Sequence, residues 1–178
     1  MKRFSTTLLL AASLTAGTSF ATPAVDTTAR QKEVAQRGHD VMPFSLLATT
    51  HIFSKTADGG IQLVVTKQDD PKQVALIRQH LAMIAQQFAA GDFDGPEHIH
   101  GKDMPGLEVL RAAKPGELKI TYRDLPNGGA IVYQTGVPRL VIALHQWFDA
   151  QLADHGHDAM SGKESAKVPH HSANAEMP

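Results

Sequence analysis

The 178-residue sequence contains no cysteine. Disulfide bonds are therefore excluded, and side-chain packing alone must hold the fold together. Cysteine nucleophiles and thiolate metal ligands are excluded for the same reason. Histidine, methionine and the carboxylates remain as possible ligands of a transition-metal ion. Histidine is abundant, with ten residues in the chain.

The chain also has no large excess of positive or negative charge, and it lacks the short motifs of familiar enzyme classes. The formal net charge is −1, and there is no clustered basic patch of the kind that binds nucleic acid. The chain has no Gly-x-Ser-x-Gly motif, no phosphate-binding glycine loop and no His-Glu-x-x-His motif. These absences argue against a nucleic-acid partner, and they favour a binding protein over an enzyme.

The N-terminus has the pattern of a secretory signal peptide. Lys2 and Arg3 precede an apolar run over residues 8–17, and the small residues Ser19 and Ala21 follow it. This order is typical of a leader that is cleaved after Ala21. The apolar run is shorter than the roughly 20 residues that a membrane-spanning helix needs. We therefore expect export to the periplasm, with no stable membrane insertion after cleavage.

The remaining chain divides into three parts by composition. Residues 22–43 are polar and predict a flexible N-terminal arm. Residues 44–155 contain the periodic apolar patterns and predict a single domain. Residues 156–178 are rich in small and polar residues, and they predict a disordered tail that contains histidine and methionine.

The first half of the domain predicts a hairpin followed by a long helix. Residues 46–53 and 61–67 are rich in β-branched and apolar residues, and an Asp-Gly pair lies between them. Such a pair between two strands favours a tight hairpin turn. Apolar residues then recur at helical spacing from Pro71 up to Gly91, which predicts an amphipathic helix with proline in its first turn and glycine at its end.

The second half repeats this order after a short helix at 107–113. Residues 118–123 alternate between apolar and polar, a Pro-Asn-Gly-Gly turn follows, and residues 130–135 return as a second strand. A last helix is predicted over 138–154. The order is β-β-α-(short α)-β-β-α. It predicts an α+β fold in which a mostly antiparallel four-stranded sheet, made of two hairpins, carries two main helices packed on one face.

The segment GPEHIHGKDMPG, residues 95–106, is the first candidate metal site. If its backbone is extended, the side chains of His98 and His100 leave the same face. Met104 adds a thioether, which favours Cu(I), whereas imidazole suits both copper and zinc. The alternative is a polar turn in which His98 is exposed and His100 bonds the backbone.

Three further histidines lie in predicted strands and helices. His51, His80 and His145 would converge if the predicted helices pack on the face of the sheet that carries His51. His145 also has Asp149 one helical turn later, a spacing at which a carboxylate can orient an imidazole. This pair is a weak candidate for catalysis, and the alternative for His80 is a boundary position beside the apolar stripe.

The C-terminal segment offers a third candidate. His155, His157 and Met160 lie close together in sequence, and His170 and His171 follow. A flexible tail of this composition can capture divalent ions loosely. The alternative is a solvated tail in which the histidines have no ligand.

Four segments carry a resemblance to a known group: FSLLATTHIFSKTADGGIQ, IHGKDMPG, YRDLPNGG and LHQWFDAQLADHG. Over residues 43–158 the chain resembles small exported bacterial proteins that are often labelled aspartate carbamoyltransferase. The resemblance implies export and the domain limits given above. A carbamoyltransferase needs two α/β domains and a Ser-Thr-Arg-Thr phosphate loop. This chain has one small domain and no such loop, so we do not expect that activity.

Taken together, the sequence predicts a periplasmic metal-binding or metal-handling protein, with copper the first choice of ion and zinc the second. No organic cofactor is expected. One alternative is a periplasmic module that binds a small ligand or another protein without metal. The other is a hydrolase or transferase that uses the pair His145 and Asp149.

Overall fold

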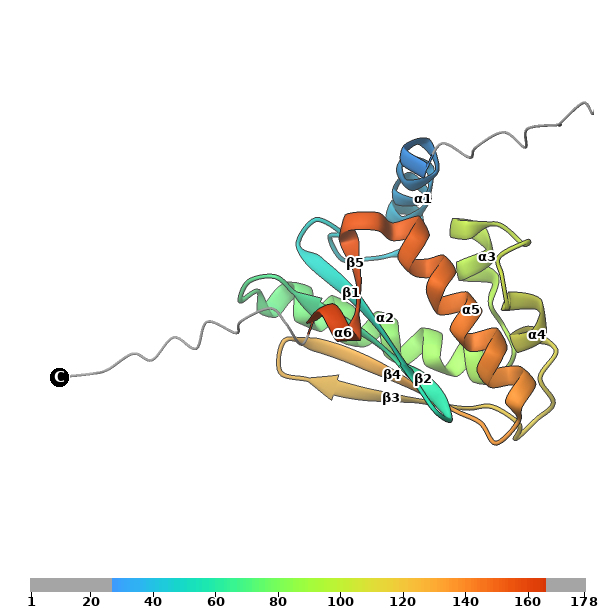
Figure 1. Cartoon of the computed structure of the whole chain (residues 1–178). Coiled ribbons are helices and arrows are strands. Elements are labelled where there is room, and N and C mark those ends of the chain that lie inside the picture. Colours follow the sequence, from blue (N-terminus) through green and yellow to red (C-terminus); the bar gives the residue numbers. More distant parts are fainter. Residues whose placement is uncertain (1–26, 166–178) are drawn as a thin grey trace, which may run out of the picture.

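The computed structural model describes residues 27–165, which form one mixed α+β unit around a five-stranded sheet (Figure 1). The strand order across the sheet is β3-β4-β2-β1-β5. The signal peptide predicted for residues 1–21 and the end of the predicted tail lie outside the described residues. The strands are β1 (Thr49–Thr56), β2 (Gly59–Thr66), β3 (Lys119–Leu125), β4 (Gly128–Gln134) and β5 (Ala159–Ser161).

Two long helices, α2 and α5, supply most of the packing against the sheet. None of the helices within residues 27–165 is long and apolar enough to cross a membrane. The helices are α1 (Thr27–Val41), α2 (Pro71–Ala89), α3 (Asp94–His100), α4 (Leu107–Arg111), α5 (Pro138–His155) and α6 (Gly162–Ser165), with a 3₁₀ turn η1 (Gly156–Asp158).

The α+β class is confirmed, whereas the four-stranded sheet was incomplete. β1 pairs with β2 and β3 pairs with β4, both antiparallel, and β2 joins β4 to make one sheet. The fifth strand, β5, pairs in parallel with β1, with Ile52 opposite Met160. It was missed because it has only three residues and arises from backbone pairing at a sheet edge, which residue composition does not report.

Both long helices lie on the same face of the sheet. Successive strand residues alternate between faces, and Phe53, Ile131 and Tyr133 belong to the buried core on one of them. On α5, the Phe148 ring centroid lies 5.1 Å from that of Phe53 and 5.7 Å from that of Tyr133. On α2, Leu81 belongs to the same core. The core therefore forms between this face and the two helices, as the sequence predicted for the helices.

The first turn of α2 is capped by a side chain. The Asp70 carboxylate accepts hydrogen bonds from the backbone N–H groups of Lys72 and Gln73, each at 3.1 Å. We expect Asp70→Ala to lower the free energy of unfolding by about 1 kcal/mol, because two helix N–H groups lose their acceptor. Urea unfolding measures the effect. Asp69→Ala, at the exposed neighbouring carboxylate, is the matched control, and an equal loss in both variants would contradict the cap.

The N-terminal arm predicted for residues 22–43 differs from the structure, because most of it is helix α1. Val34 is fully buried, and Arg30 bonds the carboxylate of Asp154 on α5 and the backbone carbonyl of His100 on α3. The helix has few apolar residues, so its sequence alone gives a weak signal. Its contacts with α3 and α5 stabilise it instead.

The first part of the predicted disordered tail has regular structure as well. Residues 156–165 form η1, β5 and α6, and Asp158 lies 3.8 Å from the ammonium group of Lys67. Strand β1 holds this segment in place. Its edge pairs with β5, and it also contacts α6. Only the tertiary structure supplies such an edge, so composition predicted disorder here.

Candidate functional site: a cavity lined by histidines

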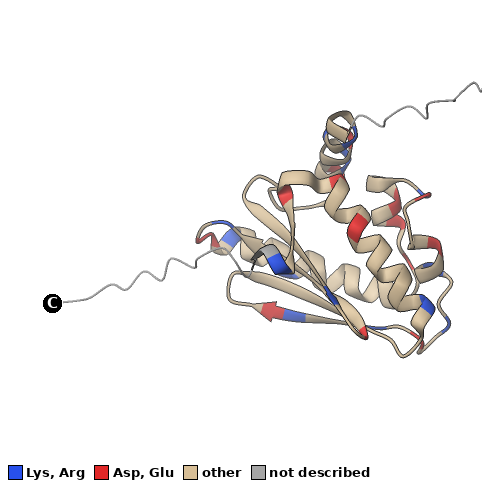
Figure 2. Ribbon diagram, viewed as in Figure 1, with Lys and Arg blue, Asp and Glu red and all other residues tan. Residues whose placement is uncertain are grey.

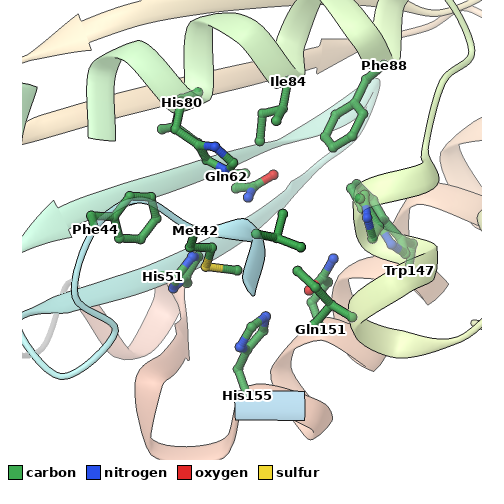
Figure 3. A pocket seen from close by; sticks show the side chains of 15 residues that line it. Met42, Phe44, His51, Gln62, His80, Ile84, Phe88, Trp147, Gln151 and His155 are labelled. Atoms are coloured by element: carbon green, nitrogen blue, oxygen red, sulfur yellow. The ribbon is translucent and has the colours of Figure 1, made fainter. Parts of the chain in front are cut away.

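A cavity of about 50 Å³ lies between the helix-covered face of the sheet, α2, α3 and α5 (Figure 3). The end of α1 and the segment after it close one side. No Asp, Glu, Lys or Arg side chain lines it. The lining residues are Val41, Met42, Phe44, His51, Gln62, His80, Leu81, Ile84, Phe88, Gly95, Pro96, Ile99, Trp147, Gln151 and His155.

His51 on β1 is the most buried of the three histidines that line the cavity. It is only 3% exposed, and its Nδ1 atom has no hydrogen-bond partner. Burial, followed by the nearby His80, lowers the pKa of His51 to about 4, while a backbone hydrogen bond with Asp158 acts in the opposite direction. The ring is therefore uncharged at neutral pH and keeps one unpartnered nitrogen.

His155 ends α5 and stacks on His51. The ring centroids lie 5.1 Å apart and the planes differ by 6°. Burial lowers the pKa of His155 well below its usual range, and the neighbouring His51 and His100 add to this effect. A pair of imidazoles in contact avoids charge because two adjacent positive rings would repel each other without water between them.

His80 on α2 faces the cavity from the other side, where its ring meets the Phe44 ring edge-on at 5.7 Å. Burial lowers the pKa of His80 as well. The sequence left His80 open between a boundary position and a site residue, and the structure buries it at the cavity. Next to it, Gln62 accepts a hydrogen bond from the Tyr133 hydroxyl at 2.9 Å.

His100 connects this cavity to an ion pair nearer the surface. Its ring lies edge-on to His155, with centroids 5.0 Å apart, and its Nδ1 lies 2.8 Å from Asp154 Oδ2. Arg30 holds the same carboxylate at 2.7 Å. Burial alone would raise the pKa of Asp154, but hydrogen bonds from His100 and Arg30 hold it well below its usual range. Arg30, Asp154, His100, His155 and His51 thus form a continuous series of contacts.

The segment 95–106 does not form the site that an extended chain would give. Its first half belongs to helix α3, in which residues two apart point about 200° away from each other. His98 is accordingly exposed and His100 buried. Met104 packs in the hydrophobic core at 6% exposure. These three side chains therefore do not converge.

The pair of His145 and Asp149 does not form either. The His145 Nε2 atom lies 3.1 Å from the carbonyl oxygen of Thr56 and 2.9 Å from that of Gly59, at the β1–β2 turn. Asp149 pairs instead with Lys55. His145 lines no part of the cavity, and its Nε2 atom contacts the hairpin turn.

Among the described residues, the structure brings only two candidates of the C-terminal segment near each other, because His155 and His157 both line a second hollow beside α1. His155 is buried at the cavity, His157 is exposed, and Met160 lies on the opposite face of the sheet from His51. His170 and His171 lie outside the described residues. Within residues 27–165, no three His, Asp or Glu side chains are already arranged to hold a metal ion.

Several lining residues were missed from the sequence, most notably Met42, Gln62 and Trp147. Trp147 is buried at 1% exposure. Its Nε1 atom and His51 Nδ1 are the two buried side-chain nitrogen or oxygen atoms in the described part of the chain that have no hydrogen-bond partner. Both residues line this cavity. Buried polar atoms are nearly always paired, so two unpaired ones at one cavity indicate a missing ligand or water.

Comparison of the chain with protein-family models, with curated proteins and with solved structures finds no match.

Proposed function

We propose that this cavity binds one Cu(I) ion through the imidazoles of His51 and His155 and the thioether of Met42, in a protein that is exported to the periplasm. The observation that carries the proposal is the buried, unpartnered Nδ1 of His51 beside a second uncharged imidazole. Met42 lines the same cavity, and its thioether points toward the His51 ring (Figure 3).

The protonation state of the rings suits metal binding. A histidine must be deprotonated before one of its nitrogens can bind an ion. Burial has already lowered the pKa of both His51 and His155, so no proton has to leave at neutral pH. The backbone contact of His51 with Asp158 resembles the outer hydrogen bond that orients metal-binding histidines.

Binding requires a small rearrangement of the two rings. Ligand nitrogens that lie about 2 Å from one ion are about 3–4 Å from each other. Stacked rings with parallel planes do not direct their nitrogens at a common point, so one ring has to rotate. The 5.1 Å between the ring centroids brings both within reach of one ion. The unbranched Met42 side chain can follow by changing rotamers.

Because the cavity wall has no charged side chains, it favours a monovalent ion over a divalent one. None of the lining residues is a carboxylate, so a divalent ion would be buried without a countercharge, which is costly. Thioether and imidazole ligands together select Cu(I) over the harder ions. Zinc, the second choice from the sequence, prefers four ligands, and no set of even three is ready in residues 27–165.

The test is an anaerobic competition titration of the metal-free protein with a chromogenic Cu(I) chelator. We expect one ion per chain with a dissociation constant below about 1 µM, a binding free energy of at least about 8 kcal/mol. Zn(II) should bind more weakly at this site. The variant His170→Ala/His171→Ala should keep the tight site, which separates it from loose capture by the tail. Affinity no tighter than micromolar, or tight binding lost in the tail variant, would refute the proposal.

A second candidate is a small uncharged organic ligand, and a specific observation favours it. The indole N–H of Trp147 is buried without an acceptor, and a metal ion cannot accept its hydrogen bond. The mostly apolar, uncharged lining also suits such a molecule, which has to be very small because the cavity measures about 50 Å³. Native mass spectrometry of the purified protein distinguishes the two candidates. A bound organic mass together with no response to Cu(I) would favour the second.

A further inference from the structure

The face of the sheet that points away from α2 and α5 carries a continuous set of apolar side chains. Strand residues alternate between faces, so the neighbours of the core residues point to this second side. We call this set the open face and define it as Ile52, Ile61, Leu63, Val65, Ala130 and Val132.

The strand register places these side chains next to one another. Leu63 is opposite Ile52 on one side and Ala130 on the other, and Ile61 is opposite Val132. Four residues of the set are only partly buried, whereas Ile52 and Ala130 are buried. The four are Ile61, Leu63, Val65 and Val132. Within residues 27–165, the long helices pack on the other side of the sheet, and α6 lies against β1 and β5 at one margin, where Gly162 meets the Ser54 side chain. No described element thus covers the middle of the open face.

This surface is almost without charge. β2 and β4 contain no Lys, Arg, Asp or Glu (Figure 2). On the same side, the charged side chains of the neighbouring β3 are Lys119 and Arg123, and both belong to the outer strand of the sheet. An uncharged apolar sheet face is unusual on a soluble surface and is typical of an interaction site.

We propose that the open face binds the same face of a second copy of this chain, as a two-fold symmetric sandwich of sheets. Two sheets pack in this way about 10 Å apart. In an isologous contact the apolar set faces itself, and the basic residues on the outer strand can remain at the rim. No carboxylate from β1, β2 or β4 is buried in such a contact.

The size of the face indicates how strong this contact is. The four strands β1 to β4, each of seven to eight residues, at about 3.3 Å per residue and about 4.8 Å between strands, give a face of roughly 500 Å², in which the outer strand β3 forms one margin. Two copies would bury about 1,000 Å², the lower limit for a specific interface. The dimer should therefore be reversible, with a dissociation constant in the micromolar range.

The chain's own C-terminal residues are a poor alternative occupant. Residues 166–178 include only two large apolar side chains, Val168 and Met177. A second copy supplies six apolar side chains in a matching arrangement. If the C-terminal residues cover the face instead, the protein stays monomeric at every concentration.

Sedimentation velocity of the purified protein over about 1 to 300 µM tests the proposal. We expect a monomer–dimer equilibrium that Leu63→Lys shifts at least tenfold toward monomer. Leu47→Lys is the matched control, because Leu47 is 79% exposed and lies outside the strands. It should leave the equilibrium unchanged.

A monomer across the whole range would overturn the proposal, and so would a dimer that Leu63→Lys does not weaken. Circular dichroism establishes that each variant is folded. If Leu63→Lys does not fold, Val132→Lys on the neighbouring strand is measured in its place. A dimer that Val132→Lys does not weaken would then overturn the proposal. The proposal does not depend on what the cavity binds, because the open face lies on the other side of the sheet.

Discussion

Replacement of His155 by glutamine is expected to weaken Cu(I) binding by about 100-fold or more. Loss of an outer partner of a metal ligand already lowers affinity 10- to 100-fold, and His155 is proposed as a ligand itself. Glutamine is uncharged and similar in size, so the end of α5 should keep its packing against His51. The competition titration used for the wild-type protein measures the change.

The matched control is His157→Gln, two residues further along the chain. His157 is exposed and does not line the cavity, so this variant should bind Cu(I) as the wild type does. A second control is His145→Gln, at the histidine that bonds the β1–β2 turn. That variant should lose stability but keep its affinity. If His155→Gln and His157→Gln weaken binding equally, the ion is bound by the C-terminal segment and not by the cavity.

Acidification from pH 7.5 to pH 5 is expected to destabilise the metal-free protein by at least about 2 kcal/mol. The folded state keeps His51 uncharged down to a pKa of about 4, whereas a histidine in the unfolded chain takes up a proton near pH 6.5. The unfolded state therefore binds more protons in this range, and stability falls as the pH falls. At about 1.4 kcal/mol per pH unit, His51 alone contributes about 2 kcal/mol by pH 5.

His80 and His155 act in the same direction, because burial lowers the pKa of each. Asp154 acts in a different range. Its pKa is held below the unfolded value, so its contribution to the free energy of unfolding persists until the pH falls below about 4. The loss between pH 7.5 and pH 5 thus belongs to the buried histidines.

Urea unfolding at several pH values measures this dependence. His51→Leu should flatten the curve between pH 7.5 and pH 5, whatever its stability at pH 7.5. His98→Gln, at an exposed histidine, should leave the slope unchanged. A wild-type stability that is constant over this range would contradict the buried, uncharged state of the cluster.

Local patterns predicted those parts of the fold that depend on neighbouring residues. The two hairpins follow from glycine turns between alternating strands, and α2 follows from Pro71 and the apolar periodicity after it. Helix α1 and strand β5 were not predicted. The first depends on the ion pair of Arg30 with Asp154, more than 120 residues away, and the second on the free edge of β1.

The candidate site, like the fold, was predicted from the sequence only in part. The sequence named all four clustered histidines but assigned them to three separate sites. His51 and His80 were expected to meet across the sheet and helices, and they do line one cavity. His100 was paired with His98 on the assumption of an extended chain, and the helical backbone of α3 separates them. His155 was placed at the end of the domain, just past the predicted last helix, and was grouped with the histidines of the tail. Helix α5 instead continues through it and buries its ring.

The sequence by itself determined the chemistry that is available: no thiol, ten imidazoles, no common catalytic motif, and two ββα patterns that build one α+β fold. Only the tertiary structure decided which imidazoles share a cavity and which of them are uncharged. Residue type and periodicity act over a few positions along the chain. The pKa of His51 and the unpaired Trp147 nitrogen are instead set by residues that are distant in sequence and lie close together only after folding.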